Sequence, residues 1–460
     1  MRLTRREALI CAGSALISGL SPRLGMASSA HELIASVGQS QLAPSQYPKT
    51  EIWGYNGEIP GPLIKVRRGE YVRRKFVNKL PQSSTIHWHG IRIDNKMDGV
   101  PHLTQELVKP GDDFEYDFVA PDAGTYWYHP HNKTWEQMAR GLYGPLIVEE
   151  DDPPEVDEDL TLLVDDWRLT QEARISDDFG SMMDWSHAGR LGNWVTVNGI
   201  GDYKHHVKKH QRIRLRLINV SNSRVFSLGW NGMRSWLLAL DGQPVSKPTE
   251  INRIELAPAQ RVDLFVDITG EEGGDAFLLF QDREQSHKIA SFTINAAMRS
   301  SLLNAPASLS PNNISEIGNL KTAKKIDLIM EGGAMGRMRG AVLNGEYRNM
   351  RDLAASGHLW AFNNNAGLTE KPLAEIEIGQ TVIMSIVNDT AWPHAMHLHG
   401  HHFRRLDKGD RLGPLRDTVL MERGERIQIA FVADNPGKWL FHCHMLEHSA
   451  SGMVTWLKVA

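Results

Sequence analysis

Alternating apolar and polar residues mark most of the regular structure that the sequence predicts. The stretch Arg212–Ile218 reads RIRLRLI, which has the period of two expected of a half-buried β-strand. Helix signals are sparse, and the best candidate is the stretch Tyr347–Ser356, closed by Gly357. The pattern therefore predicts an all-β protein.

The chain contains three copies of one pattern. Each copy opens with a tryptophan, turns on asparagine or glycine, and runs into an alternating strand that ends at an asparagine. The copies run from Trp53 to Asn78, from Trp194 to Asn219 and from Trp360 to Asn388. Such repeats predict three β-sandwich domains in tandem. The acidic segment 149–158 and the Ser/Asn/Pro-rich segment 300–315 are the expected linkers, and the predicted domains are residues 31–152, 153–305 and 306–460.

Histidines are concentrated at matching places in the first and third copies. The chain has 20 histidines, and four His-x-His pairs lie at equivalent positions of these two copies, which random placement does not explain. The middle copy has Leu228 where the outer copies have the first histidine of a pair, so we expect it to serve as scaffold. The pairs are His87 and His89, His129 and His131, His397 and His399, and His442 and His444. Of the others, His205, His206 and His210 are expected at the surface, and His401 and His402 behind the third pair.

The spacing of these histidines suits a metal site. Residues i and i+2 of a strand point to one face about 6.5 Å apart, so each pair offers two imidazoles on one side. Cys443 lies inside the last pair, with His394 ahead of the third pair and His448 and Met453 downstream. Two histidines, one cysteine and a weak axial methionine are the ligands of a blue-copper electron-transfer centre. The sequence thus predicts one copper bound by Cys443, whose two neighbours in the chain, His442 and His444, belong to an eight-histidine cluster.

Four motifs of the chain resemble those of the multicopper oxidase family. They read HWHG from His87, HPH from His129, HAMHLHG from His394 and HCHMLEHSASGM from His442, and they span essentially the whole mature chain. The resemblance implies three cupredoxin-like domains and four coppers that couple oxidation of a reducing substrate to reduction of dioxygen to water. It assigns the type 1 copper to His394, Cys443, His448 and Met453, the type 2 copper to His87 and His397, and the type 3 pair to His89, His129, His131, His399, His442 and His444.

The resemblance also indicates residues that move electrons and protons. Cys443 and His448 are expected to carry the electron, which an exposed edge of His448 receives. Asp98 matches the family's acid near the type 2 copper and is the candidate proton relay, with an Asp-Gly turn as the alternative. Where relatives usually carry an acid just after the second type 1 histidine, this chain has Ser449 and Ala450, so a second relay acid is not expected there.

A cluster of methionines suggests how the reductant is bound. Met330, Met335, Met338 and Met350 lie within one short stretch, and thioether sulfur binds Cu(I) well. We expect Met335 and Met338 to hold Cu(I) on a mobile glycine-rich loop, with Asp417 bordering the substrate site. Core filling by the flexible methionines and backbone capping by Asp417 are the alternatives.

Residues 1–30 predict an export signal. Arg5 and Arg6 precede an apolar run over residues 8–20, which is shorter than the roughly 20 residues that span a bilayer. The stretch resembles a twin-arginine signal, which implies the twin-arginine export machinery and the periplasm, and an ordinary secretory signal is the alternative. No later run reaches membrane-spanning length, and a net charge of −4 without a basic stripe argues against a nucleic-acid partner.

These observations predict an exported oxidase. Its reductant is expected to be a metal ion, Cu(I) or Mn(II), or a phenol, and its oxidant dioxygen. A non-catalytic copper-binding or structural cupredoxin-fold protein of the cell envelope is the alternative, as is passive copper storage. All twelve expected copper ligands are present, which favours the oxidase.

Overall fold

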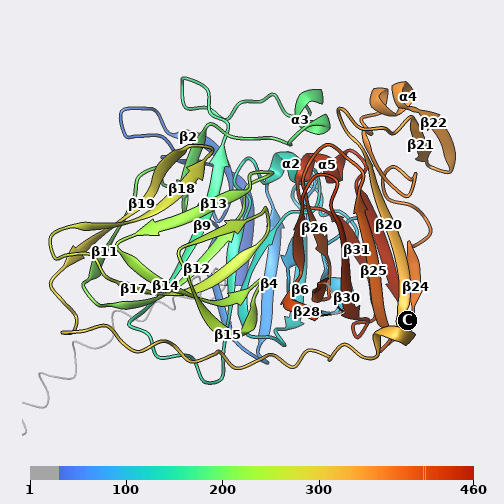
Figure 1. The fold of residues 1–460 in the computed structure, drawn as a ribbon. Coiled ribbons are helices and arrows are strands. Elements are labelled where there is room, and N and C mark those ends of the chain that lie inside the picture. The colour runs from blue at the N-terminus through green and yellow to red at the C-terminus, as the bar shows by residue number, and fades with distance from the viewer. Residues whose placement is uncertain (1–30, 408, 410) are drawn as a thin grey trace, which may run out of the picture. The chain divides into compact units, whose positions relative to one another are not determined.

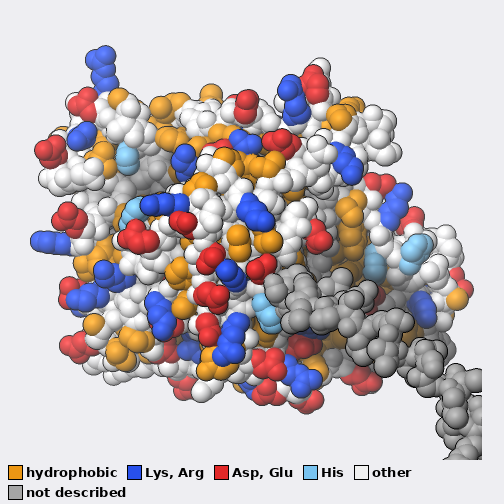
Figure 2. Space-filling model, turned by 180° about the vertical axis from the view of Figure 1, so that it is seen from behind, with side chains coloured by type: hydrophobic (Ala, Val, Ile, Leu, Met, Phe, Trp, Pro, Cys, Tyr) orange, Lys and Arg blue, Asp and Glu red, His pale blue; other side chains and the backbone are white. Residues whose placement is uncertain are grey.

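The computed structural model describes residues 31–407, 409 and 411–460, and the expected export signal at residues 1–30 lies outside them. Strands dominate the described chain, as the alternation predicts, and they form pairs of stacked sheets (Figure 1). Within these residues no helix is long and apolar enough to cross a membrane. Lys and Arg are interspersed with Asp and Glu over the face that Figure 2 presents.

The first β-sandwich packs two four-stranded sheets, ordered β2-β1-β4-β6 and β3-β8-β7-β5. Its core is rich in aromatic side chains, including Phe76, Trp88 and Tyr128. The strands are β1 (Glu32–Ser40), β2 (Thr50–Tyr55), β3 (Ile64–Arg67), β4 (Tyr71–Asn78), β5 (His87–His89), β6 (Asp113–Val119), β7 (Gly124–His129) and β8 (Gly144–Glu149), with the short helices η2 (Asn95–Met97) and α2 (Thr134–Gln137).

The second sandwich packs a six-stranded sheet, β10-β9-β12-β17-β14-β15, against a five-stranded sheet, β11-β19-β18-β13-β16. Aliphatic residues such as Leu215 and Leu264 fill its core. The strands are β9 (Glu158–Trp167), β10 (Trp194–Val197), β11 (Tyr203–Lys208), β12 (Arg212–Asn219), β13 (Phe226–Asn231), β14 (Met233–Leu240), β15 (Gln243–Ile251), β16 (Arg253–Leu256), β17 (Arg261–Ile268), β18 (Asp275–Asp282) and β19 (Gln285–Asn295), with α3 (Met182–Ser186) before β10.

The third sandwich packs the sheet β23-β20-β25-β30-β27-β28 against β24-β32-β31-β26-β29, and β21 and β22 form a separate hairpin. The strands are β20 (Lys324–Gly332), β21 (Gly340–Leu343), β22 (Glu346–Asn349), β23 (Trp360–Phe362), β24 (Ala374–Ile376), β25 (Thr381–Asn388), β26 (His394–Leu398), β27 (Phe403–Asp407), β28 (Arg411–Arg416), β29 (Thr418–Met421), β30 (Arg426–Val432), β31 (Gly437–Cys443) and β32 (Val454–Val459), with the helices η3 (Leu320–Thr322), α4 (Met350–Ala355) and α5 (Leu446–Ala450).

The one predicted helix is shorter than expected. Tyr347 belongs to strand β22 and pairs with Val342, so the helix begins only after Asn349. The Asn349 side chain accepts hydrogen bonds from the backbone N–H groups of Arg351 and Asp352 and thus caps α4. Gly357 follows the helix with φ 78°, the left-handed conformation in which helices commonly end.

The asparagine that ends a strand in each repeat makes the same hydrogen bonds. Its side-chain nitrogen donates to two backbone carbonyls, and its side-chain oxygen accepts from the backbone N–H two residues on. The nitrogen bonds join Asn78 to Gln82 and Val108, Asn219 to Arg224 and Leu256, and Asn388 to Trp392 and Glu422, at 2.8–2.9 Å. The oxygen bonds come from Leu80, Ser221 and Thr390. The repeat therefore preserves the corner that leads into β5, β13 and β26.

Segments without strands separate the three sandwiches. β8 ends at Glu149 and β9 begins at Glu158, and a longer segment without strands joins β19 to η3. The three sandwiches belong to one unit, Leu33–Ala460. We retain domain boundaries after residues 152 and 305 as a proposal.

Three histidines expected at the surface of the middle sandwich differ in their surroundings. His206 is exposed. His205 is half-buried, with Nε2 at 2.7 Å from a carboxylate oxygen of Glu158, and His210 bonds through Nδ1 to the carbonyl of Arg299 at 2.7 Å. None of the three belongs to a group of ligand-type side chains found among the described residues.

Candidate metal centres

Cys443 lies at the end of β31, against His394 at the start of β26 and His448 in α5. Its Sγ is 3.5 Å from His394 Nδ1 and 3.7 Å from His448 Nδ1, and the two Nδ1 atoms are 3.0 Å apart. The Cys443 N–H donates to the Met453 carbonyl at 3.1 Å, and all four residues are completely buried. This group can hold one metal ion.

Burial changes the protonation of this group. It raises the pKa of the Cys443 thiol to about 12 and lowers the pKa of His448 to about 4. Burial, together with the neighbouring His448, lowers the pKa of His394 well below its usual range. Both imidazoles are therefore neutral at pH 7, as metal ligands must be, and the thiol needs a bound cation to ionise.

The prediction that one edge of His448 is exposed is wrong. His448 is 0% exposed, and its Nε2 donates to the carbonyl oxygen of His187 at 2.7 Å. His187 follows α3 of the middle sandwich, and the Trp360 ring covers His448 from another side at 4.4 Å between centroids. Sequence reasoning missed this cover because a backbone carbonyl leaves no motif.

The eight paired histidines meet between the first and third sandwiches. β5 pairs with β7 so that His87 lies opposite His129, and β26 pairs with β31 so that His397 lies opposite His442. In each of three groups the ligand atoms lie within 4.8 Å of one another. The groups are His89, His129 and His444; His131, His399 and His442; and His87, His89 and His397.

Unpartnered nitrogens show that this cluster suits cations. One ring nitrogen is buried without a hydrogen-bond partner in each of His87, His89, His129, His131 and His397, and both ring nitrogens are in His444. Burial lowers the pKa of most of these imidazoles well below the usual range, so they are neutral at pH 7. Buried unpaired acceptors are costly, and a shared metal ion is a partner that can satisfy them.

Two carboxylates bridge the cluster in reciprocal fashion. His87 Nδ1 donates to the Asp98 carbonyl at 2.8 Å, and His399 Nδ1 donates to Asp98 Oδ2 at 2.9 Å. His397 Nδ1 donates to the Asp417 carbonyl at 2.9 Å, and His89 Nε2 donates to Asp417 Oδ1 at 3.3 Å. Each acid therefore orients one histidine of its own sandwich and one of the other. Hydrogen-bonded partners of this kind set the ring orientation of metal ligands.

The position of Asp417 differs from the expected substrate site. It lies between β28 and β29, and it is 0% exposed beside the cluster histidines. Burial by itself raises the pKa of Asp417, and the Arg261 guanidinium with His397 and His89 lowers it well below its usual range. Asp417 contacts the cluster because Thr418 pairs with His397 across β26 and β29.

The structure separates the two methionines expected at the substrate site. Met335 is 74% exposed, and the N–H of the preceding Ala334 donates to the carbonyl of Ser186 at 2.7 Å, next to His187. Met338 is half-buried and packs against the cluster that contains Leu343 and Leu353. Met330 is a core residue, so core filling holds for part of this group. Sequence reasoning missed Met182 and Met183 on α3, which are 50% and 63% exposed.

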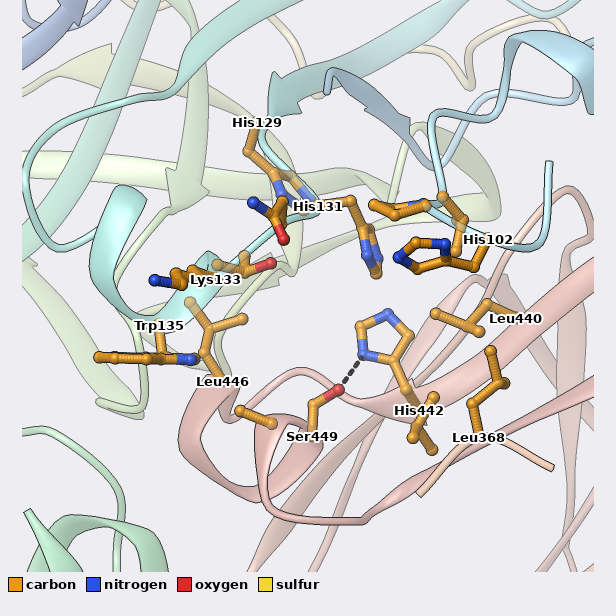
Figure 3. A pocket seen from close by; sticks show the side chains of 16 residues that line it. His102, His129, His131, Lys133, Trp135, Leu368, Leu440, His442, Leu446 and Ser449 are labelled. Atoms are coloured by element: carbon orange, nitrogen blue, oxygen red, sulfur yellow. Dashed lines mark hydrogen bonds between the residues drawn. The ribbon is translucent and has the colours of Figure 1, made fainter. Parts of the chain in front are cut away.

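A cavity of about 330 Å³ opens onto the cluster (Figure 3). Its wall includes His129, His131 and His442, and Ser449 Oγ lies 3.4 Å from His442 Nδ1. None of its lining residues carries a carboxylate, whereas Lys133 and His102 are among them. The cavity is wide enough to admit a small molecule such as dioxygen.

His401 and His402, which follow the third histidine pair, are buried behind the cluster, where His402 Nε2 lies 3.2 Å from Gln243 Nε2.

A buried cysteine–histidine centre, one residue away from an eight-histidine cluster in a three-sandwich chain, defines a copper-dependent redox protein. Comparison with known proteins agrees. Sequence profiles described as multicopper oxidase match residues 36–153, 158–299 and 345–460.

Similar proteins cover nearly the whole chain. Lac15 from a marine microbial metagenome is 38% identical, with a TM-score of 0.76 over 93% of this chain and 99% of that one. A multi-copper oxidase from Pseudomonas thermotolerans is 31% identical, with a TM-score of 0.81 over 93% of this chain and 98% of that one. A multicopper oxidase of Staphylococcus haemolyticus is 28% identical over 443 residues, which cover 93% of this chain and 88% of the relative.

The chain belongs to the multicopper oxidase family. It is an oxidoreductase built of three cupredoxin-like β-sandwiches, and the non-catalytic alternative is not favoured.

Proposed function

We propose that this oxidase binds four coppers and couples oxidation of a metal ion or a phenol to reduction of dioxygen to water. The observation that carries the proposal is the set of buried, unpartnered imidazole nitrogens that converge in groups of three. When bound, copper supplies the one-electron steps and the storage of electrons that dioxygen reduction requires.

Each group of donors has its own place in this proposal. His394, Cys443, His448 and Met453 would hold the type 1 copper, and His87 and His397 the type 2 copper. His89, His129 and His444 would hold one type 3 copper, and His131, His399 and His442 the other. Cys443 is bonded to both His442 and His444, so the backbone links the site of oxidation directly to the site of reduction.

Asp98 is the proposed proton relay. Its carboxylate is 2% exposed and lies 3.2 Å from His87 Nδ1 through Oδ1 and 2.9 Å from His399 Nδ1 through Oδ2. It thus stands between the type 2 ligand His87 and the type 3 ligand His399, where a carboxyl group can pass protons to reduced oxygen. The alternative role of Asp98 in a turn also applies to its backbone, because the Asp98 N–H donates to the Asn95 carbonyl.

We propose a metal ion, Cu(I) or Mn(II), as the reductant, with a phenol as the second candidate. The cover over His448 keeps a bulky phenol ring away from that imidazole, because His448 Nε2 is hydrogen-bonded to the His187 carbonyl. Met182 and Met183 lie on α3 just ahead of His187, and Met335 follows Ala334, whose N–H donates to the Ser186 carbonyl. All three methionines are exposed, and thioether sulfur suits Cu(I). Met338 is not a ligand in this proposal, because it is half-buried and packs against the cluster that contains Leu343 and Leu353. This proposal leaves Asp417 out of the substrate site, because its side chain is buried beside the cluster histidines.

We also propose export of the folded protein to the periplasm through the twin-arginine machinery. The paired arginines Arg5 and Arg6 ahead of a short apolar run support this proposal. Replacing both arginines with lysine should leave the protein inside the cell, and unchanged export would contradict the proposal.

The deciding experiment measures copper content and oxygen uptake together. The copper-loaded protein should contain four coppers per chain and take up oxygen when supplied with Cu(I), Mn(II), ferrous ion or a phenol in separate assays. The ratio of the four rates identifies the reductant. Zinc in place of copper, a single copper per chain, or no oxygen uptake with any of the four would overturn the proposal.

A further inference from the structure

Arg261 is a buried charge that links all three sandwiches. It begins β17 of the middle sandwich and is 0% exposed. Its Nη1 donates to Asp417 Oδ1 at 2.9 Å, and its Nη2 lies 2.7 Å from Asp417 Oδ2. Arg261 thus contacts both oxygens of Asp417, a residue of the third sandwich. Its Nε donates to the carbonyl of Thr125 in the first sandwich at 3.1 Å.

The carboxylate that Arg261 holds determines how one cluster histidine is turned. His89 Nε2 donates to Asp417 Oδ1, and the nitrogen left unpartnered in His89 is Nδ1. In His87, His129 and His397 the unpartnered nitrogen is Nε2. His89 is therefore turned the opposite way from these three rings, and the acceptor that keeps it so is Asp417.

The glycine after His89 makes room for this ion pair. Gly90 has φ +83°, and a Cβ added there would lie 2.2 Å from Arg261 Nη2 and 2.4 Å from Asp417 Oδ2. Both distances are far shorter than any real contact, so a side chain at residue 90 and the ion pair exclude each other. The HWHG motif thus ends in glycine for a reason that involves a residue of the middle sandwich.

Arg261 also distinguishes two acids that are otherwise equivalent. Asp98 and Asp417 contact the cluster in the same reciprocal way, through a backbone carbonyl and a side-chain oxygen. The described hydrogen bonds and ion pairs of the Asp98 carboxylate involve only histidines, whereas both oxygens of the Asp417 carboxylate also lie against a guanidinium. One hydrogen bond to Oδ1 and a close charge contact with Oδ2 from the same planar guanidinium favour a single orientation of the Asp417 carboxylate.

We propose that Arg261 is a positioning residue of the oxygen-reducing site: its guanidinium fixes the Asp417 carboxylate, and that carboxylate holds the ring of His89 with Nδ1 toward the cluster. The inference rests on the proposed function. It gives the middle sandwich, which contributes no metal ligand, a direct part in the geometry of the cluster.

The test compares Arg261→Met and Arg261→Lys with Arg212→Met. Arg212 is a matched control because it is also a buried arginine of the middle sandwich, with a two-bond pair to Asp267 at 2.7 and 2.8 Å, and it contacts no cluster residue. Loss of a partner that orients a metal ligand costs about 10- to 100-fold in activity or metal affinity. We expect a loss of that size in oxygen turnover for Arg261→Met and a smaller one for Arg261→Lys, which keeps the charge but not the fork.

Spectroscopy separates positioning from general stability. The electron paramagnetic resonance signal of the type 2 copper, or the near-ultraviolet band of the type 3 pair, should change in both Arg261 variants, while the blue absorption at Cys443 stays unchanged. Arg212→Met should lower the unfolding midpoint and leave all three signals and the turnover as in the parent. If Arg261→Met does not fold, Arg261→Lys carries the comparison.

Three outcomes decide the inference. Changed cluster signals with an intact blue band support it. Arg261 variants whose spectra and turnover match those of Arg212→Met would overturn it while leaving the oxidase proposal intact. A parent protein that binds no copper would overturn the proposed function, and this inference with it.

Discussion

Asp98→Asn is the substitution that tests the proposed proton relay most directly. Asparagine has the shape of aspartate, and its side-chain oxygen can still accept the hydrogen bond from His399 Nδ1 that now measures 2.9 Å. The charge and the ability to give up a proton are lost. The copper ligands should therefore stay in place while proton delivery fails.

The size of the expected effect follows from the contacts of Asp98. An orienting partner of metal ligands is worth about 10- to 100-fold, and a general acid or base about 100- to 10,000-fold. Because asparagine preserves the orienting bond, we expect a fall in kcat for oxygen reduction of at least about 100-fold, with copper content and blue colour retained. During turnover the type 1 copper should stay reduced, since electrons arrive but oxygen does not consume them.

The assay is stopped-flow absorption of the blue band with oxygen uptake recorded in parallel. Asp122→Asn is the matched control, because Asp122 is a buried acid of the first sandwich that pairs with Arg92 at 2.7 Å and touches no cluster histidine. The control should lower stability and leave the reoxidation rate unchanged. Loss of one copper in Asp98→Asn would show that Asp98 only supports the copper ligands. Kinetics equal to those of the parent would show that Asp98 serves only in the turn.

Three further substitutions test other parts of the site. Cys443→Ser should abolish the blue absorption and the turnover while the fold, measured by circular dichroism, is kept; turnover at the parental rate would show that electrons bypass residue 443. Met335→Leu should raise KM for Cu(I) severalfold and leave a phenol's KM unchanged, whereas half-buried Met338→Leu should change neither; equal effects of the two would contradict a sulfur ligand at residue 335. Gly90→Ala should lower the free energy of unfolding by clearly more than Gly57→Ala. Both glycines have positive φ, which costs alanine about 1–2 kcal/mol of strain, but of the two only Gly90 has other atoms where a Cβ would lie. Equal losses in the two variants would refute the steric argument.

The repeated asparagines explain why so much of the fold could be predicted from the sequence. Alternation identifies individual strands, and Asn78, Asn219 and Asn388 mark the same corner three times, so the three sandwiches could be aligned without a structure. The four histidine pairs could be recognised for the same reason, whereas the division of the donors among the coppers is what the resemblance to multicopper oxidases implies. A strand fixes which side chains share a face, so each pair presents two imidazoles on one side, and the structure brings the four pairs together.

The contacts that the sequence did not predict come from residues distant in the chain. The cover of His448 is a backbone carbonyl of His187, and every residue has one, so no residue type signals it. Likeness to a substrate-site acid predicts a different place for Asp417, because the neighbours of Asp417 are set by the pairing of β29 with β26. Arg261 lies in an ordinary alternating strand, and nothing local shows that its side chain crosses into another sandwich.

The middle sandwich shows how chemistry and fold are divided in this chain. Leu228 lies opposite Phe280 at the pairing position where His87 faces His129 and His397 faces His442. Leu228 and Phe280 are buried in an apolar core, so this strand pairing is stable without any metal. The outer sandwiches carry histidines at these positions, and their buried nitrogens without a hydrogen-bond partner can be satisfied by a bound cation. The sandwich with the apolar pair is also the one whose buried Arg261 reaches Asp417 beside the histidine cluster.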